Sequence, residues 1–92
     1  MKRPSPEKIE QLRKELYEGI DAGTVDIPEA SKLMRKILGM SRQTYAAKIL
    51  RGVSFQTLQA VETRQGNPTL KTLEEIGKPF GLKVSFIHDV DD

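Results

Sequence analysis

A short polar segment, residues 52–62, contains the side chains best suited to specific chemical recognition. Ser54 is placed to cap the start of a helix, and Gln56 and Gln59 follow with amides that both donate and accept hydrogen bonds. The apolar residues of the segment recur at helical spacing, which predicts that they face inward and the amides outward. An outward glutamine on such a helix can bond an adenine edge in the DNA major groove.

The segment lies in a stretch of chain without acidic residues. Between Ala30 and Val61 there are six Lys or Arg and no Asp or Glu, although the net charge of the whole chain is only +2. Local positive charge of this kind favours an anionic partner. Double-stranded DNA fits better than a membrane surface, because the stretch lacks one long amphipathic basic helix.

The composition argues against most other classes of protein. The 92 residues fit one domain and include no cysteine, so disulfides, zinc fingers and thiol nucleophiles are excluded. His88 is the single histidine and has no catalytic or metal-binding partner at a suitable spacing. We therefore expect no enzyme activity, no metal and no cofactor. We also expect a cytoplasmic protein, because neither a signal peptide nor a membrane span is evident.

The elements that must position the polar segment are predicted to be about five short helices. Their expected starts are Ser5, Pro28, Ser41, Ser54, and either Asn67 or Thr69. The segment Leu82–Ile87 then nearly alternates and is rich in β-formers, which predicts a short C-terminal strand. Its expected partner is the same strand of a second copy, or alternatively residues 24–27 of the same chain.

The chain is expected to divide into three parts. Residues 1–27 form an N-terminal extension helix and linker, residues 28–81 the central domain, and residues 82–92 a strand and tail. The extension helix carries a narrow apolar stripe of Ile9, Leu12, Leu16 and Ile20. This stripe either packs on the chain's own core or forms a surface for a partner.

The expected helices Ser41–Leu50 and Ser54–Thr63, joined by a tight turn, make a helix-turn-helix. Here the sequence resembles the phage-repressor-like DNA-binding domains, also called Cro/CI-type or XRE. The resemblance covers about Leu33 to Leu82. The residues that carry it are Leu38-Gly39-Met40-Ser41, Tyr45-Ala46, Gly52-Val53-Ser54, Glu62, Asn67-Pro68-Thr69-Leu70 and Phe80-Gly81-Leu82.

The resemblance implies a mainly α, lambda-repressor-like fold and assigns residues to DNA. The base-contacting set would be Ser54, Phe55, Gln56, Gln59, Ala60 and Thr63. The phosphate-contacting set would be Ser41, Arg42, Gln43, Arg64, Gln65 and Asn67. Arg35 and Glu62 would form a structural ion pair.

The sequence departs from the family pattern at several positions. Two additional residues stand before Gly52, within residues 47–51, and we expect them to lengthen the first helix of the motif rather than loosen the turn. Arg64 stands where relatives often have glycine, and a left-handed conformation there would cost about 1–2 kcal/mol. Arg42 stands where relatives usually have glutamine, so its contact with the DNA backbone would differ in kind.

The expected function is a sequence-specific transcriptional regulator. It would repress its own operon as a homodimer joined through Leu82–Ile87, on a pseudo-palindromic operator. The alternative is the antitoxin of a toxin–antitoxin pair, similar to HigA, whose main role is to bind a protein toxin. That alternative follows from the resemblance alone.

Overall fold

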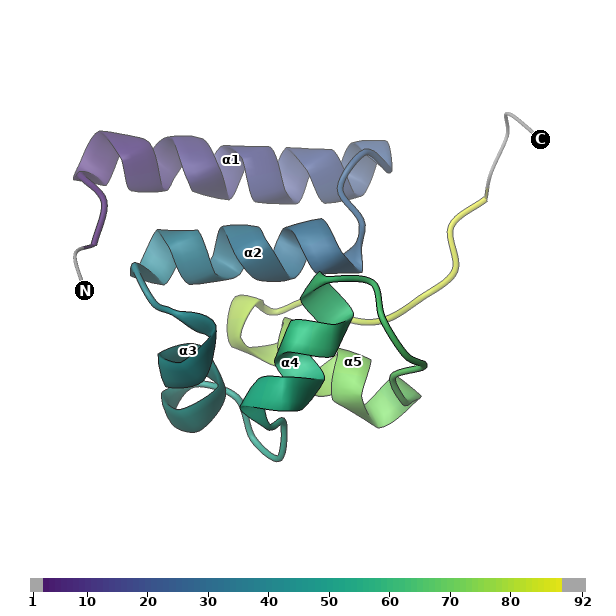
Figure 1. Ribbon diagram of the computed structural model, residues 1–92. Coiled ribbons are helices and arrows are strands. Elements are labelled where there is room, and N and C mark those ends of the chain that lie inside the picture. The colour runs from purple at the N-terminus through teal and green to yellow at the C-terminus, as the bar shows by residue number, and fades with distance from the viewer. Residues whose placement is uncertain (1–2, 89–92) are drawn as a thin grey trace.

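The computed structural model describes residues 3–88 as a two-layered helical domain. Its helices are α1 (Pro6–Ala22), α2 (Ile27–Leu38), α3 (Arg42–Lys48), α4 (Phe55–Glu62) and α5 (Leu70–Gly77), followed by the 3-10 turn η1 (Lys78–Phe80). Helices α1 and α2 lie side by side, and α3, α4 and α5 lie on the other side of α2 (Figure 1). The prediction of a mainly α fold with about five helices is confirmed.

Side-chain caps fix where each α-helix begins. In every case a hydroxyl or carboxylate oxygen accepts a hydrogen bond from a backbone N–H three residues later, which satisfies one of the unpaired donors of the first turn. The capping residues are Ser5, Asp26, Ser41, Ser54 and Thr69. Four of these caps agree with the expected starts. The second helix begins earlier than expected, because Asp26 caps it one residue before Ile27.

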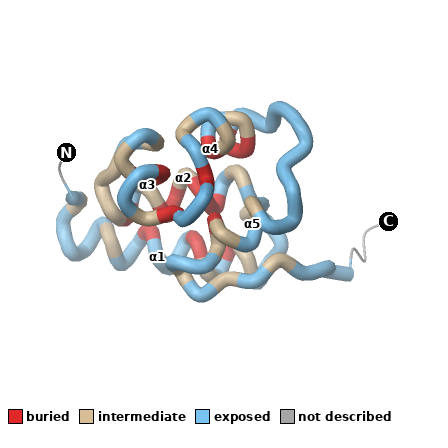
Figure 2. The backbone as a smooth tube through the Cα atoms, turned by 90° about the horizontal axis from the view of Figure 1, so that it is seen from below, coloured by how far each residue is buried: buried red, intermediate tan, exposed pale blue. Residues whose placement is uncertain are grey.

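The hydrophobic core forms where α2 meets the other helices. Tyr45, Leu16, Met34, Leu58 and Ile76 are its largest fully buried apolar residues. They come from all five helices, so each helix contributes at least one residue to a single core. The buried parts of the backbone gather around α2, α3 and α4, whereas the C-terminal segment is largely exposed (Figure 2).

Helix α1 is part of this core. Leu12 and Leu16 are buried against α2, and Ile9 and Ile20 pack beside them at partly buried positions. The apolar stripe of α1 therefore packs largely on the chain's own core, which is the first of the two alternatives.

The predicted C-terminal strand is absent. Within residues 3–88 no residue lies in a β-strand, and neither Leu82–Ile87 nor residues 24–27 pair with another segment. A segment of alternating apolar and polar residues forms a β-strand only where a neighbouring strand can bond its backbone N–H and C=O groups. Here Leu82 instead packs on the core, and Val84 and Ile87 line an apolar groove beside α5.

The end of α5 explains how this segment is attached. The backbone N–H of Leu82 donates to the carbonyl oxygen of Gly77 at 3.0 Å. A Cβ at position 77 would lie 3.0 Å from the Leu82 oxygen, so glycine permits this close approach. Pro79 lacks a backbone donor, so the α-helix ends at Gly77 and continues as the 3-10 turn η1.

The connection between α3 and α4 also differs from expectation. Helix α3 ends at Lys48, so the prediction of a longer helix reaching Leu50 is wrong. The N–H of Leu50 donates to the carbonyl oxygen of Tyr45, five residues back, which breaks the helical pattern. Leu50 and Val53 then both turn into the core, with Gly52 between them at a φ of 70°. The two additional residues therefore lie in a longer turn that is anchored by apolar side chains.

Candidate nucleic-acid interface

Helix α4 presents a polar face to solvent. Ser54, Gln56, Gln59 and Thr63 are exposed, whereas Leu58 and Val61 point into the core. Phe55 and Ala60, the other two predicted base-contacting residues, are half-buried at the edge of this face. The structure therefore brings the six residues together on one short helix and its ends, and four of them are exposed.

The side chains of this face differ in how far they are already engaged. The Ser54 hydroxyl accepts from the N–H of Thr57 at 3.1 Å and donates to the Thr57 hydroxyl at 2.9 Å. The Thr63 hydroxyl donates to the carbonyl oxygen of Gln59 at 2.7 Å. In contrast, the side-chain amides of Gln56 and Gln59 make no hydrogen bond to another described residue. They are the groups of this surface that remain ready to bond a ligand.

The predicted phosphate-contacting residues lie at two places that flank α4. Ser41, Arg42 and Gln43 stand at the start of α3, where Ser41 is the helix cap and Gln43 is exposed. Arg64, Gln65 and Asn67 are exposed in the loop between α4 and α5. Backbone N–H groups and the positive end of the α3 dipole add to the attraction for an anion at the first place.

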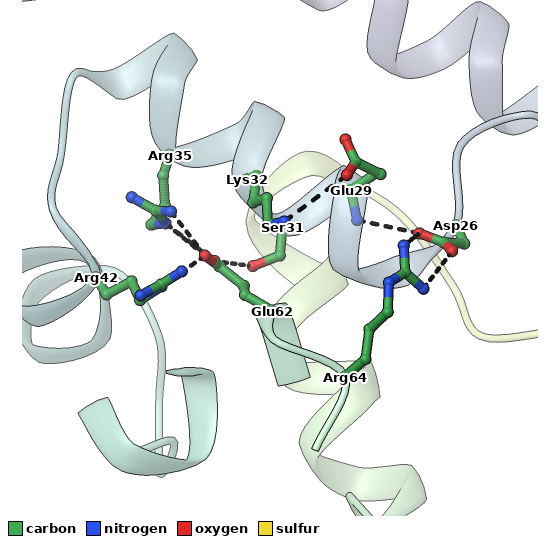
Figure 3. Close-up of polar contacts among 8 residues, drawn as sticks. All are labelled: Asp26, Glu29, Ser31, Lys32, Arg35, Arg42, Glu62 and Arg64. Carbon is green, nitrogen blue, oxygen red and sulfur yellow. Dashed lines mark hydrogen bonds and ion pairs between the residues drawn. The ribbon is translucent and has the colours of Figure 1, made fainter. Parts of the chain in front are cut away.

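A buried carboxylate at the end of α4 connects three helices. Glu62 is buried, and Ser31 and Arg35 from α2 and Arg42 from α3 all converge on it (Figure 3). The Ser31 hydroxyl donates at 2.6 Å, Arg35 donates through Nε and Nη2 at distances down to 2.7 Å, and Arg42 Nε donates at 2.9 Å. Arg35 also donates through Nη1 to the carbonyl oxygen of Met40. This network fixes α4 relative to α2 and α3.

The electrostatics of the network keep Glu62 ionised. Burial alone would raise the pKa of its carboxyl, but the hydrogen bonds from Arg35, Ser31 and Arg42 outweigh that effect, and the pKa lies below its usual value. The hydroxyl of Tyr45 lies in the same region, and burial together with the Glu62 charge raises its pKa to about 12. Two guanidinium groups share one carboxylate, so the cluster retains a net positive charge beside the start of α3.

Sequence reasoning placed Arg35 with Glu62 but missed two features of the network. Ser31 was not singled out, although it stands four residues before Arg35 on the same face of α2. Arg42 was assigned to phosphate alone, yet its Nε is bonded to Glu62. The absence of any other acidic residue within the basic stretch was the signal that could have indicated a second arginine on Glu62.

A second ion pair lies at the other end of the surface. Arg64 has a left-handed backbone with a φ of 62°, and its guanidinium contacts the Asp26 carboxylate (Figure 3). The Nη1–Oδ2 distance is 2.7 Å and the Nη2–Oδ1 distance is 3.2 Å. The hydrogen bond from Arg64 is the main reason that the pKa of Asp26 lies below its usual value. No sequence pattern indicates this pair, because its members are 38 positions apart.

The sequence profile of the helix-turn-helix family matches residues 32–87, which is more than half of the chain. The chain belongs to the Cro/CI-type helix-turn-helix family. Helices α3 and α4 are the two helices of its helix-turn-helix, which is a DNA-binding motif. Comparison with curated proteins and with solved structures finds no match to this chain.

The family assignment covers less than the whole structure. The match begins within α2, so α1 lies outside it although α1 belongs to the same core. Among the helices of residues 3–88, none is long and apolar enough to cross a membrane.

Proposed function

We propose that this helix-turn-helix protein is a sequence-specific transcriptional regulator that acts as a homodimeric repressor of its own operon. The observation that carries the proposal is the exposed face of α4, where the amides of Gln56 and Gln59 have no hydrogen-bond partner among the described residues. A face of this kind suits base edges, because an amide can bond an adenine in two places at once.

In the proposed complex, the first turns of α4 enter the major groove. Gln56 bonds an adenine, Phe55 contacts a thymine methyl group, and Gln59, Ala60 and Thr63 follow the groove. Ser54 contributes mainly by capping the helix, because both hydrogen bonds of its hydroxyl go to Thr57. Base selectivity then depends most on the two glutamines.

The flanking residues hold the protein on the DNA backbone. Gln43 at the start of α3, and Gln65 and Asn67 after α4, are exposed on either side of the base-contacting face. Arg42 binds Glu62 through Nε, which leaves its Nη1 and Nη2 donors without a hydrogen bond to another described residue and available to a phosphate. Contacts of this kind position the protein and carry no sequence information directly.

The proposal is tested by selecting binding sites for the purified chain from a pool of random duplexes. A regulator of this kind should enrich a short motif, and two inverted copies should recur about 34 Å, or one helical turn, apart. Enrichment of no motif, with equal affinity for selected and random duplexes, would contradict sequence-specific binding.

Replacing Gln56 with alanine should remove selectivity at one base position of the enriched motif. Loss of a bidentate contact to adenine is expected to cost about 1–3 kcal/mol against the preferred base and little against the others. The matched control is Gln11→Ala, which changes an exposed glutamine on α1. Competition binding with duplexes that differ at one base pair measures the selectivity of both variants. Equal losses for preferred and substituted duplexes would show that Gln56 does not contact a base.

The C-terminal segment is the proposed dimer contact. Phe86 is 100% exposed, and Ile87 is 75% exposed and lines the apolar groove beside α5. Contiguous exposed apolar surface of this kind can mark an interaction site. The proposed contact is made by side-chain packing and involves no strand pairing.

The double substitution Phe86→Ser and Ile87→Ser should convert the dimer to a monomer. Leu82 and Val84, which are partly buried in the chain's own fold, are left unchanged so that folding is preserved. Sedimentation velocity measures the mass, with Leu70→Ser as the control for an exposed leucine elsewhere. A dimer that persists in the double variant would place the contact on another surface.

A further inference from the structure

Arg64 adopts a backbone conformation that its residue type disfavours. It is the single non-glycine residue with a positive φ in the part of the chain that the structure describes. In this region Cβ crowds the following carbonyl oxygen, and glycine would avoid that strain. Strained residues gather at functional sites, so the conformation points to a role for the arginine side chain.

The ion pair with Asp26 does not account for an arginine at this position. The side chains of Arg64 and Asp26 are 56% and 52% exposed, and exposed ion pairs contribute little to folding stability because water screens them. Arg64 also lies two residues after the end of α4, in the loop proposed to contact phosphate. An anion other than Asp26 is therefore within its reach when DNA is bound.

We propose that Asp26 restrains DNA binding by competing with a backbone phosphate for Arg64. The inference rests on the proposed function. In the free chain the carboxylate neutralises the guanidinium through both oxygens, at 2.7 and 3.2 Å. To contact a phosphate on DNA, Arg64 must first break this pair with Asp26. Asp26 therefore weakens binding to all sequences alike, because phosphate contacts carry no sequence information.

A second role of Asp26 makes the restraint testable. Its Oδ1 also accepts a hydrogen bond from the N–H of Glu29 at 3.1 Å, which caps α2. Asparagine caps a helix about as well as aspartate, so Asp26→Asn removes the charge and keeps the cap. The carboxylate is ionised at neutral pH, where the restraint acts, and the hydrogen bond from Arg64 holds its pKa below the usual value.

The experiment measures binding to a random-sequence duplex by fluorescence anisotropy over a series of salt concentrations. Asp26→Asn should bind about 3- to 10-fold more tightly at low salt, because Arg64 no longer has to leave a carboxylate to reach a phosphate, and the gain should shrink as salt screens the charges. Asp26→Ser also caps α2 without a charge and should bind the duplex as tightly as Asp26→Asn. Glu10→Gln makes the same change of charge on the exposed surface of α1 and should change the affinity by less than about two-fold.

The pairing itself is tested in an Arg64→Gly background. There Asp26→Asn should have almost no effect, because no guanidinium is left to release. Equal tightening with and without Arg64 would show that Asp26 acts through its own charge, and would overturn the competition. Unchanged or weaker binding by Asp26→Asn, with a wild-type chain that binds, would overturn the inference alone. A wild-type chain that binds no duplex even at low salt would overturn the proposed function as well.

Discussion

Replacing Glu62 with alanine is expected to lower the free energy of unfolding by about 3 kcal/mol, measured by urea denaturation at pH 7. Removing one partner of a buried ion pair typically costs about 3–5 kcal/mol, because the remaining charge is left without compensation. The side chains of Arg35 and Arg42 are 17% and 29% exposed, so water partly screens the charges left behind. The expected cost therefore lies at the lower end of this range. A domain of this size has a total free energy of unfolding of roughly 5–14 kcal/mol, so the loss is a large share of it.

The pH dependence of stability provides the control for this interpretation. The pKa of Glu62 is lower in the folded chain than its usual value of 4.5, so the carboxylate stabilises the fold above that pH. This contribution is lost as the pH falls through the folded pKa. The difference in stability between wild type and Glu62→Gln should therefore shrink on acidification.

The control for Glu62→Ala is Glu10→Ala, on the surface of α1, which should cost less than about 0.5 kcal/mol at pH 7. A loss near that value for Glu62→Ala would contradict the network's structural role.

Replacing Leu16 with alanine should also cost roughly 3 kcal/mol of folding stability. Leu16 is fully buried between α1 and α2, and truncating such a leucine loses its transfer free energy and leaves a cavity. The variant tests whether α1 is an integral part of the domain, although it lies outside the family match. Denaturation should remain one cooperative transition.

The control for this variant is Leu70→Ala, the same change at an exposed leucine at the start of α5. It should alter the unfolding free energy by about 0.5 kcal/mol or less. If Leu16→Ala has an equally small effect, α1 is a separate appendage and the single core described above is incorrect.

The features that were predicted from sequence are those set by local chemistry. Ser5, Ser41 and Ser54 cap helices because the hydroxyl reaches an N–H only three residues away, and this pattern is visible along the chain. The outward placement of Gln56 and Gln59 follows in the same way from the 3.6-residue period. The helix-turn-helix assignment, which rested on the family resemblance, agrees with the profile match over residues 32–87.

The features that were missed depend on distant partners. Leu82–Ile87 alternates as a strand does, but pairing is decided by whether another strand is present, and none is found within residues 3–88. The turn after α3 depends on space in the core for Leu50 and Val53. The Asp26–Arg64 pair joins residues with no pattern between them, so only the folded structure could reveal it.

The central claim is that DNA binds the face formed by α4 and its two flanks. The most direct test is to titrate the isotope-labelled chain with the duplex recovered by selection and to follow its amide NMR signals. The largest shifts should occur at Gln56 and Gln59 and their neighbours, then at Gln43 and Gln65, with little change on the exposed side of α1. Shifts that gather instead on α1, or that leave the side-chain amides of Gln56 and Gln59 unchanged, would contradict this account.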